Sequence, residues 1–483
     1  MTRFLPESRL TDPHGWGVRA GVIAGSAFLV FVISAGRLIP PTVGIGVIVM
    51  LMVGALAFRS TQTVVVLGLI AVALIPVYWG PVIPHTHIGV LPVLGVCLIL
   101  LPRAWSEWAR LRLTTIDWLM AGYVAMRIVG SLVNSSRGAG GALDAVLYAA
   151  LPYTVFRLLG MDANIRRAAA WAVVIGGVAA SVFAIREYDG GGNPFFRLFR
   201  NGYQHSYWIR VDFRFRHVRP EASFGHADAL GLFLAFSVVL AIALAWHEKD
   251  VFKRALLYGG VLVCLQGIAD TLERGPIILM LVAFPIILLV ELRHGRSFRV
   301  VLAAVAALVV FAVTPFGAAA LRLRDASVDQ TNKYGLQASA QDRYDTIRDM
   351  TNPRFFTWLG HDQGDDPTLS VQQAIGLNTG LGAIENAFMW TYVVYGALAF
   401  LPFGLMIFPA TRAAFSTRLN LIDRAWATIV VSSFVIFLSV GLASQFAHFF
   451  WIALGLTVAA MQDALAPLPA AVGPDARMLA LRG

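Results

Sequence analysis

The sequence predicts an all-α protein that is built as a polytopic bundle of transmembrane helices. Hydrophobic residues make up 58% of its 483 residues and charged residues only 14%, whereas about a quarter of the residues are charged in a soluble globular domain. Apolar windows of about 18 to 20 residues, each long enough to cross the hydrocarbon core as a helix, follow one another almost without interruption. Lipid is therefore the expected solvent for most of the chain.

The predicted spans, about fourteen with a range of twelve to fourteen, lie in a transmembrane domain of residues 18–463. The first seven are expected at roughly 18–36, 42–58, 62–80, 86–102, 115–133, 141–159 and 167–186. The other seven are expected at roughly 226–246, 255–271, 275–292, 299–316, 383–409, 425–442 and 446–463. An even number of spans places both termini on the same side of the membrane.

Lysine and arginine collect in alternate connections between these spans, and the positive-inside rule assigns such connections to the cytoplasm. They are Arg59; Arg103, Arg110 and Arg112; Arg157, Arg166 and Arg167; Lys249, Lys253 and Arg254; Arg293, Arg296 and Arg299; and Arg412, Arg418 and Arg424. Both the N-terminal segment 1–17 and the tail 464–483 are then cytoplasmic. Because residues 1–17 are too polar for the apolar core of a signal peptide, we expect the first span to be an uncleaved anchor.

Two connections on the opposite, extracytoplasmic side are long, residues 187–225 and 317–382. Loops longer than about 15 residues in a compact fold are usually functional or disordered. The first loop combines aromatic residues, which suit the headgroup level of a membrane, with the arginines Arg197, Arg200, Arg210, Arg214, Arg216 and Arg219. A guanidinium group binds phosphate oxygens through two parallel hydrogen bonds. The cluster therefore predicts phosphate recognition, and the alternative is contact with anionic lipid headgroups.

Ionisable residues inside the predicted spans lie near the extracytoplasmic ends, and only Arg127 is expected to lie deep. The residues at these ends are Asp144, Asp228, Asp270, Arg274 and Glu385. A charge at the centre of the bilayer is costly and marks an ion or proton path when it is present. The placement at one surface instead predicts a shallow site that opens to the extracytoplasmic side.

Metal, nucleotide and nucleic-acid chemistry is not expected. His85 and His87 form a His-x-His pair without a third ligand nearby. Cys97 and Cys264 lie inside predicted spans, where neither a disulfide nor a zinc site is expected. The chain has no Walker-type phosphate loop and no dinucleotide fingerprint. Its net charge of +10 suits anionic lipid surfaces and gives no sign of nucleic-acid recognition.

Three segments follow one another on the extracytoplasmic side of the C-terminal half. They are RPEASFGHADALGLFLAF from Arg219, DTLERGPIILM from Asp270 and IENAFMWTYVVYGALAF from Ile384, with QDRYDTIRDMTNPRFFTWLGHDQGD from Gln341 between the last two. In their order and spacing these segments resemble the motifs of the O-antigen ligase and polysaccharide polymerase superfamily. The spans before Arg219 match that family only in hydropathy.

The resemblance implies a GT-C-like membrane glycosyltransferase that needs no metal and no cofactor. Such an enzyme takes a glycan from an undecaprenyl-diphosphate-linked donor and transfers it, with inversion, to an acceptor hydroxyl on a glycan. It works at the extracytoplasmic face of the bacterial inner membrane, among membrane lipids, and polysaccharide export or chain-length proteins are its expected partners. Nucleic acid is not an expected partner.

The residue types support this chemistry. A departing diphosphate accumulates negative charge, which preorganised cations stabilise; Arg219 and Arg274 hold the matching motif positions. Arg343 and Arg348, which are five residues apart in the second loop, and Arg214 and Arg216 in the first are expected to bind substrate. Glu385 stands where the family has histidine in His-Asn, so we expect Glu385 to be the general base and Asn386 to bind substrate. His226 is the reserve base. A purely structural ion pair, such as Glu385 with Arg274, is the alternative for Glu385.

Three functions remain open from the sequence. Glu385 departs from the histidine of the ligases, which favours polymerisation of repeat units of a cell-surface polysaccharide. A ligase that moves the glycan to a different acceptor is the first alternative. A flippase or exporter of a lipid-linked glycan is the second alternative and belongs to another class. The charged residues at the ends of the spans favour an enzyme, because an exporter needs a polar path across the membrane.

Overall fold

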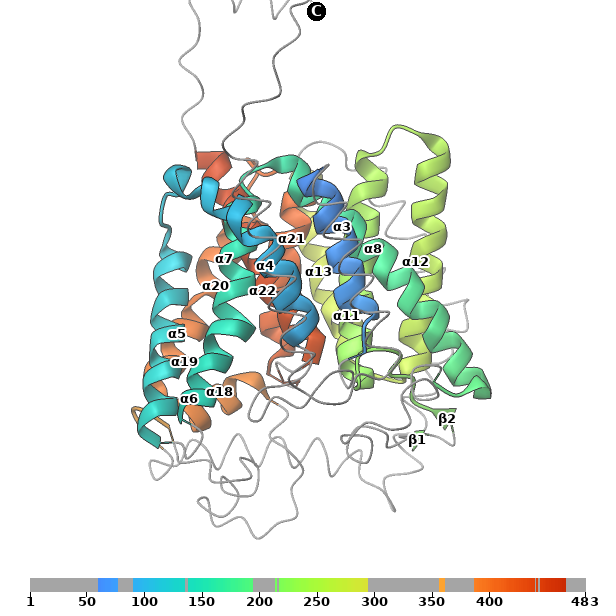
Figure 1. Ribbon diagram of the computed structural model, residues 1–483. Helices are drawn as coiled ribbons and strands as arrows, with labels where there is room; N and C mark the ends of the chain where they lie inside the picture. Colours follow the sequence, from blue (N-terminus) through green and yellow to red (C-terminus); the bar gives the residue numbers. More distant parts are fainter. Residues whose placement is uncertain are drawn as a thin grey trace, which may run out of the picture.

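The computed structural model describes residues 60–76, 90–134, 138–193, 213–214, 217–293, 356–360, 386–438, 440–441 and 444–465. The predicted spans at 18–36, 42–58 and 299–316 lie outside these residues. So do the segment 1–17, most of the tail 464–483 and nearly all of the loop 317–382. Within the described residues the chain forms helices that pack side by side (Figure 1).

Eight helical stretches are long and apolar enough to cross a membrane, judged by length and composition. They are formed by α5 (Thr115–Asn134); α6 (Gly138–Asp144), η2 (Ala145–Ala150) and α7 (Leu151–Leu159) in succession; α8 (Ala163–Arg186) with η3 (Glu187–Gly191); α11 (Ala227–His247); α12 (Val251–Thr271); α13 (Gly275–Arg293); α19 (Ala397–Leu405) with α20 (Ile407–Ala414); and α22 (Ser444–Leu465). These helices mark the chain as a helical membrane protein, and all except α19 with α20 lie within a few residues of a predicted span.

Shorter helices complete the described part of the bundle. They are α3 (Thr61–Leu74), α4 (Val90–Ser106), η1 (Trp108–Arg110), α18 (Ala387–Tyr395) and α21 (Leu421–Ile436). The structure ends α3 at Leu74, earlier than the predicted span 62–80. The physical reason is Pro76, because a proline disfavours helical geometry in the residue before it, and Ile75 is extended with φ −79° and ψ 120°.

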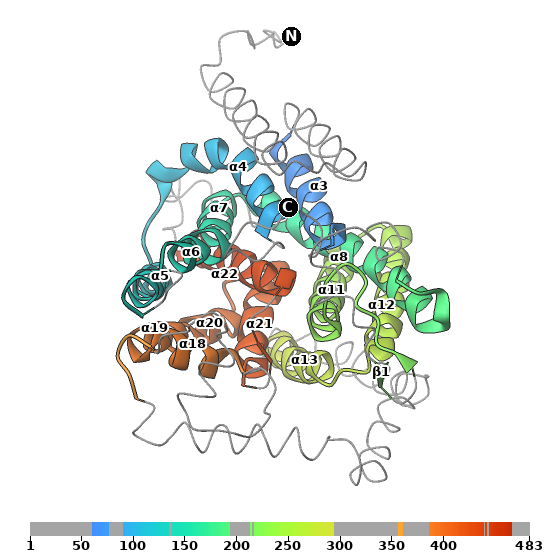
Figure 2. The same ribbon diagram turned by 60° about the horizontal axis from the view of Figure 1, so that its bottom comes forward.

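Two helices occupy the centre of the bundle, α11 and α22. In each, 89% of the most apolar window is buried inside the protein. Figure 2 shows α11 surrounded by α8, α12, α13 and α21, and all four contact it. A helix that is apolar on all sides is usually buried, and the central position of α11 follows this rule.

The two ends of the bundle differ in charge. We call one the arginine-rich end: α4, α7, α11 and α13 finish there and α5, α8 and α12 begin there, at the top of Figure 1. Its basic residues are Arg103, Arg110, Arg112, Arg157, Arg166, Arg167, Lys249, Lys253, Arg254, Arg412, Arg418 and Arg424. We call the other the hairpin end, because strands β1 (Phe213–Arg214) and β2 (His217–Val218) pair antiparallel there.

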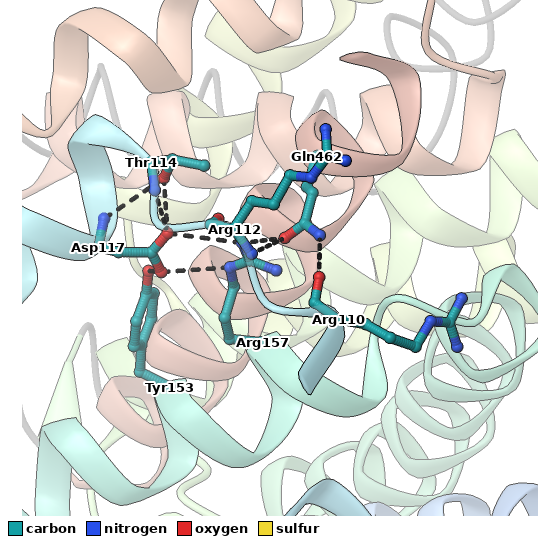
Figure 3. A network of polar contacts seen from close by, with 7 residues as sticks. All are labelled: Arg110, Arg112, Thr114, Asp117, Tyr153, Arg157 and Gln462. Carbon is teal, nitrogen blue, oxygen red and sulfur yellow. Dashed lines mark hydrogen bonds and ion pairs between the residues drawn. The ribbon is translucent and has the colours of Figure 1, made fainter. Parts of the chain in front are cut away.

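A buried carboxylate joins three helices at the arginine-rich end (Figure 3). Asp117 Oδ1 accepts hydrogen bonds from the Tyr153 hydroxyl at 2.6 Å and from Arg157 Nε at 3.2 Å. Arg157 Nη2 also donates to Gln462 Oε1 at 2.6 Å and to the Arg112 carbonyl at 3.0 Å. The network therefore ties α5, α7 and α22 together at this end.

Further ion pairs fix the neighbouring helices at the same end. Arg166 of α8 donates to both carboxylate oxygens of Asp423 on α21, at 2.6 and 3.0 Å. Arg424 of α21 donates to Glu291 of α13 at 2.6 Å. These four side chains are buried, so the pairs compensate charges that would otherwise be costly to bury.

The predicted span 383–409 is divided in the structure. It breaks at Gly396, whose φ is +81°, a conformation that favours glycine. A Cβ at this position would collide with the carbonyl oxygen of Trp358. The N-terminal piece becomes the nine-residue helix α18, and the candidate span runs instead from Ala397 to Ala414.

Candidate functional site

Two of the three motif segments meet at the hairpin end. Arg219, which follows β2, forms an ion pair with Glu273 in the turn between α12 and α13. Glu273 directly precedes Arg274 in the chain. The structure thus brings Arg219 to the turn that carries Arg274, although the two are far apart in sequence.

The turn between α12 and α13 presents Arg274 to the outside of the bundle. Leu272 ends α12 in the left-handed conformation with φ 57°, so the chain reverses within a few residues and α13 begins at Gly275. The side chain of Glu273 is nearly buried beside Arg219, whereas Arg274 is exposed. Arg219 is therefore paired with a carboxylate, whereas Arg274 is accessible to a ligand.

The N-terminus of α11 packs closely against the same turn. A Cβ at Gly231 would lie 2.5 Å from Pro276 Cγ and 3.2 Å from Thr271 Oγ1. The glycine therefore permits an approach that a larger residue would block. It brings the first turn of α11, with His226 and Asp228, to the surroundings of Arg274.

His226 caps α11 with its imidazole ring. Nδ1 accepts a hydrogen bond from the backbone N–H of Asp228 at 3.2 Å, so in the neutral ring the proton lies on Nε2. The ring is half-exposed. In this arrangement the Nε2–H offers a substrate a donor, and the role of His226 as the reserve base stays a prediction.

A set of hydrogen bonds that fixes the loop after Arg219 was not predicted from the sequence. Glu187 Oε2 accepts hydrogen bonds from the backbone N–H groups of Glu221 at 3.2 Å and Ala222 at 3.0 Å. Asn193 Nδ2 donates to the Ala222 carbonyl at 2.9 Å. Ser223 Oγ donates to the Ala73 carbonyl of α3. Glu187 in η3 and Asn193 just after it thus fix the loop that carries Arg219; no sequence signal identifies Glu187.

Asp270 lies one turn before Arg274 and is buried. Its Oδ1 accepts a hydrogen bond from Gln266 Nε2 at 2.8 Å. Its Oδ2 has no hydrogen-bond partner among the residues that the structure describes. Asp270 therefore lies at the end of α12, as expected, but its side chain is buried.

Asn386 connects the third motif segment to the same region. Its side chain caps α18 by accepting from the Met389 N–H at 3.0 Å, and Nδ2 donates to the Leu438 carbonyl at 2.7 Å. The Ala387 N–H donates to the carbonyls of Phe437 and Val440. A Cβ at Gly275, the first residue of α13, would lie 3.5 Å from Val440 Cγ2. The stretch after α21 therefore bridges Asn386 and the Arg274 turn.

A second polar cluster lies deeper at the hairpin end. Arg127 Nη2 donates to Asp144 Oδ2 and to the Tyr395 hydroxyl, both at 2.9 Å, and Nη1 donates to the Tyr123 hydroxyl at 3.2 Å. The guanidinium carbon lies 4.4 Å from the centroid of the Tyr395 ring. The side chain of Arg127 is buried in the protein; its two tyrosine partners were not predicted.

Several predicted site residues lie outside the described part of the chain. They are Arg216, Arg343, Arg348 and Glu385. For Arg214 the structure gives only the backbone, which pairs with His217 in the hairpin. Among the described residues, no group of three or more His, Cys, Asp or Glu side chains could hold a metal ion. Cys97 and Cys264 are buried free thiols.

No protein-family model, curated protein or solved structure matches this chain. The resemblance to the ligase and polymerase superfamily therefore rests on the motif segments alone.

Proposed function

We propose that this protein is an extracytoplasmic glycosyltransferase that polymerises repeat units carried on undecaprenyl diphosphate. The observation that supports the proposal most is the meeting of the segments that begin at Arg219, Asp270 and Ile384 at one end of the bundle. A polar site at the end of a bundle of membrane helices can receive a diphosphate headgroup while the polyprenyl chain stays in lipid.

The two arginines suit a diphosphate leaving group. Arg274 is exposed and is free to bind phosphate oxygens through its planar fork. Arg219 is oriented by Glu273, and Glu273 also offsets one of the two positive charges. Arg274 therefore carries most of the stabilisation of the departing diphosphate, and Arg219 positions the loop beside it.

The reaction then follows as an inverting substitution. The acceptor hydroxyl oxygen forms a bond to the anomeric carbon while the bond from that carbon to the diphosphate oxygen breaks. The electron pair of the broken bond leaves with the diphosphate, and the hydroxyl proton passes to the carboxylate of Glu385. Asn386 follows Glu385 in the chain and is fixed by the stretch after α21, so it gives the base a rigid neighbour.

The distribution of charge favours an enzyme over an exporter. Apart from Arg127 with Asp144, the ion pairs of the described residues lie towards the two ends of the helices. The deepest at the hairpin end, Arg127 with Asp144, lies about 10 Å from the helix termini at 1.5 Å per residue. An exporter of a charged lipid-linked glycan needs polar groups along a path across the membrane.

The test is an assay of the purified protein in lipid with undecaprenyl-diphosphate-linked repeat units. We expect the wild-type protein to lengthen glycan chains and release the lipid diphosphate. Arg274→Ala should lower the rate about 100- to 1,000-fold, the cost of removing one preorganised donor. Glu385→Gln should lower it about 100-fold or more.

Arg418→Ala is the matched control, because Arg418 is an exposed arginine at the arginine-rich end; it should keep the wild-type rate. Release of diphosphate only after addition of a different acceptor would identify a ligase. Movement of lipid-linked glycan across the bilayer without any release would reject the enzyme and support the exporter.

A further inference from the structure

The helix that carries Asn386 cannot be held by the membrane alone. With nine residues, α18 is about 14 Å long at 1.5 Å per residue, against a hydrocarbon core of about 30 Å. Gly396 separates α18 from α19 with a positive φ of 81°, so the helix axis does not continue. The position of α18 therefore comes from contacts with the rest of the protein: the Phe388 ring packs against Phe403 and Phe434, and hydrogen bonds attach both ends of the helix.

At its N-terminus α18 is attached to the stretch after α21. The bonds are those of Asn386 Nδ2 to Leu438 and of the Ala387 N–H to Phe437 and Val440. All three acceptors are backbone carbonyls, and the Asn386 side chain is the only side-chain donor among the three bonds.

At its C-terminus α18 is attached to α5 through Arg127. The guanidinium group donates to the Tyr395 hydroxyl at 2.9 Å and lies over the Tyr395 ring. The opposite charge of Asp144 on α6 keeps the buried guanidinium in place. A buried arginine that is paired in this way is rigid, because every movement separates charges in a medium of low dielectric constant.

The same junction receives part of the second long loop. The N–H groups of Ala397 and Leu398 donate to the carbonyls of Thr357 at 2.9 Å and Trp358 at 3.2 Å. A Cβ at Gly130 of α5 would lie 2.9 Å from the Leu359 carbonyl oxygen. Residues 356–360 therefore lie between α5 and the start of α19, beside Tyr395.

We infer that Arg127 is a positioning residue of the proposed transferase: it holds the C-terminal end of α18 through Tyr395 and so fixes the helix that Asn386 caps. The inference rests on the proposed function for its catalytic consequence. Arg127 is buried, so its proposed effect on the reaction passes through the helix. A displacement of about 1 Å in a catalytic group can cost about 100-fold in rate.

The experiment measures the position of α18 separately from the reaction. Spin labels are attached through Trp390→Cys on α18 and Ile278→Cys on α13, and their distance distribution is recorded by double electron–electron resonance in lipid nanodiscs. The native Cys97 and Cys264 are buried. Arg127→Ala and the milder Tyr395→Phe, which removes only the hydroxyl, should broaden or shift the distribution.

Tyr153→Phe is the matched control. It also removes a buried hydroxyl that bonds an Asp–Arg pair, at 2.6 Å from Asp117, but at the arginine-rich end. Its distance distribution and its turnover should equal those of the wild-type protein. Arg127→Ala and Tyr395→Phe should lower kcat, about 100-fold and about 10-fold respectively, with KM for the lipid-linked donor nearly unchanged.

An unchanged distance distribution in both variants overturns the inference, whatever their activity. A changed distribution with wild-type kcat overturns it as well, because the position of α18 would then not matter for turnover. If the distribution changes but the wild-type protein itself transfers no glycan, the proposed function fails, and with it the catalytic role of Arg127. The measured effect of Arg127 on the position of α18 would remain valid.

Discussion

Four arginines among the described residues carry their charge inside the bundle: Arg127, Arg157, Arg166 and Arg424. In each case an acidic partner on another helix compensates the charge. The positive-inside rule identified the last three only as basic residues near predicted connections. Their partners could not be predicted, since Asp117 precedes Arg157 by 40 positions and Asp423 follows Arg166 by 257. Burial of these arginines is therefore a property of the tertiary structure.

Removal of Asp117 should be among the most destabilising single changes at the arginine-rich end. Asp117→Ala leaves the Arg157 guanidinium buried without its carboxylate and should cost about 3 to 5 kcal/mol in the free energy of unfolding. Glu107→Ala is the control, because Glu107 pairs with an exposed Arg110 at 2.7 Å; it should cost about 0 to 1 kcal/mol. Thermal unfolding in detergent, followed by tryptophan fluorescence, compares the two. Equal midpoints would show that the buried network contributes little.

At the scale of the element, hydropathy predicted where helices lie but did not predict where they are interrupted. The predicted spans 115–133, 226–246 and 275–292 agree with α5, α11 and α13 within two residues at each end. The predicted span 383–409 failed because a hydropathy window does not register a positive φ at one glycine. The same limit hid the hydrogen-bonded contact between residues 356–360 and α19, which depends on Gly130, Gly360 and Gly396.

Gly396→Ala should therefore disturb the junction of α18 and α19. The substitution adds a Cβ at φ +81° against the Trp358 carbonyl, and the unfavourable backbone conformation alone costs about 1 to 3 kcal/mol. Gly404→Ala in α19 is the control: nothing lies within 4 Å of its added Cβ, and alanine is favoured over glycine in a helix by about 1 kcal/mol. We expect the melting temperature to fall for the first variant and to stay equal or rise for the second. The reverse order would contradict the assigned break.

At the scale of the whole molecule, the candidate site is built from residues that are far apart in sequence and that the fold brings together. The order of the motif segments predicted a common site, and the structure places Arg219, Arg274 and Asn386 at one end of the bundle. The supporting groups were not predictable. Glu187 acts on backbone N–H groups, and Tyr395 lies 268 positions from Arg127. The motif residues could thus be selected from the sequence as site candidates, whereas the residues that hold them in position could not.

The orientation of the molecule in the membrane follows from the same asymmetry. Basic residues gather at the arginine-rich end, so we expect that end in the cytoplasm and the hairpin end, with Arg274, outside. A single cysteine introduced by Arg274→Cys should react with a membrane-impermeant maleimide in spheroplasts, whereas one introduced by Arg418→Cys should react only after permeabilisation. The wild-type protein is the blank, because its two cysteines are buried. The opposite labelling pattern would place the candidate site on the cytoplasmic side of the membrane. It would contradict the proposed function, which requires an extracytoplasmic site.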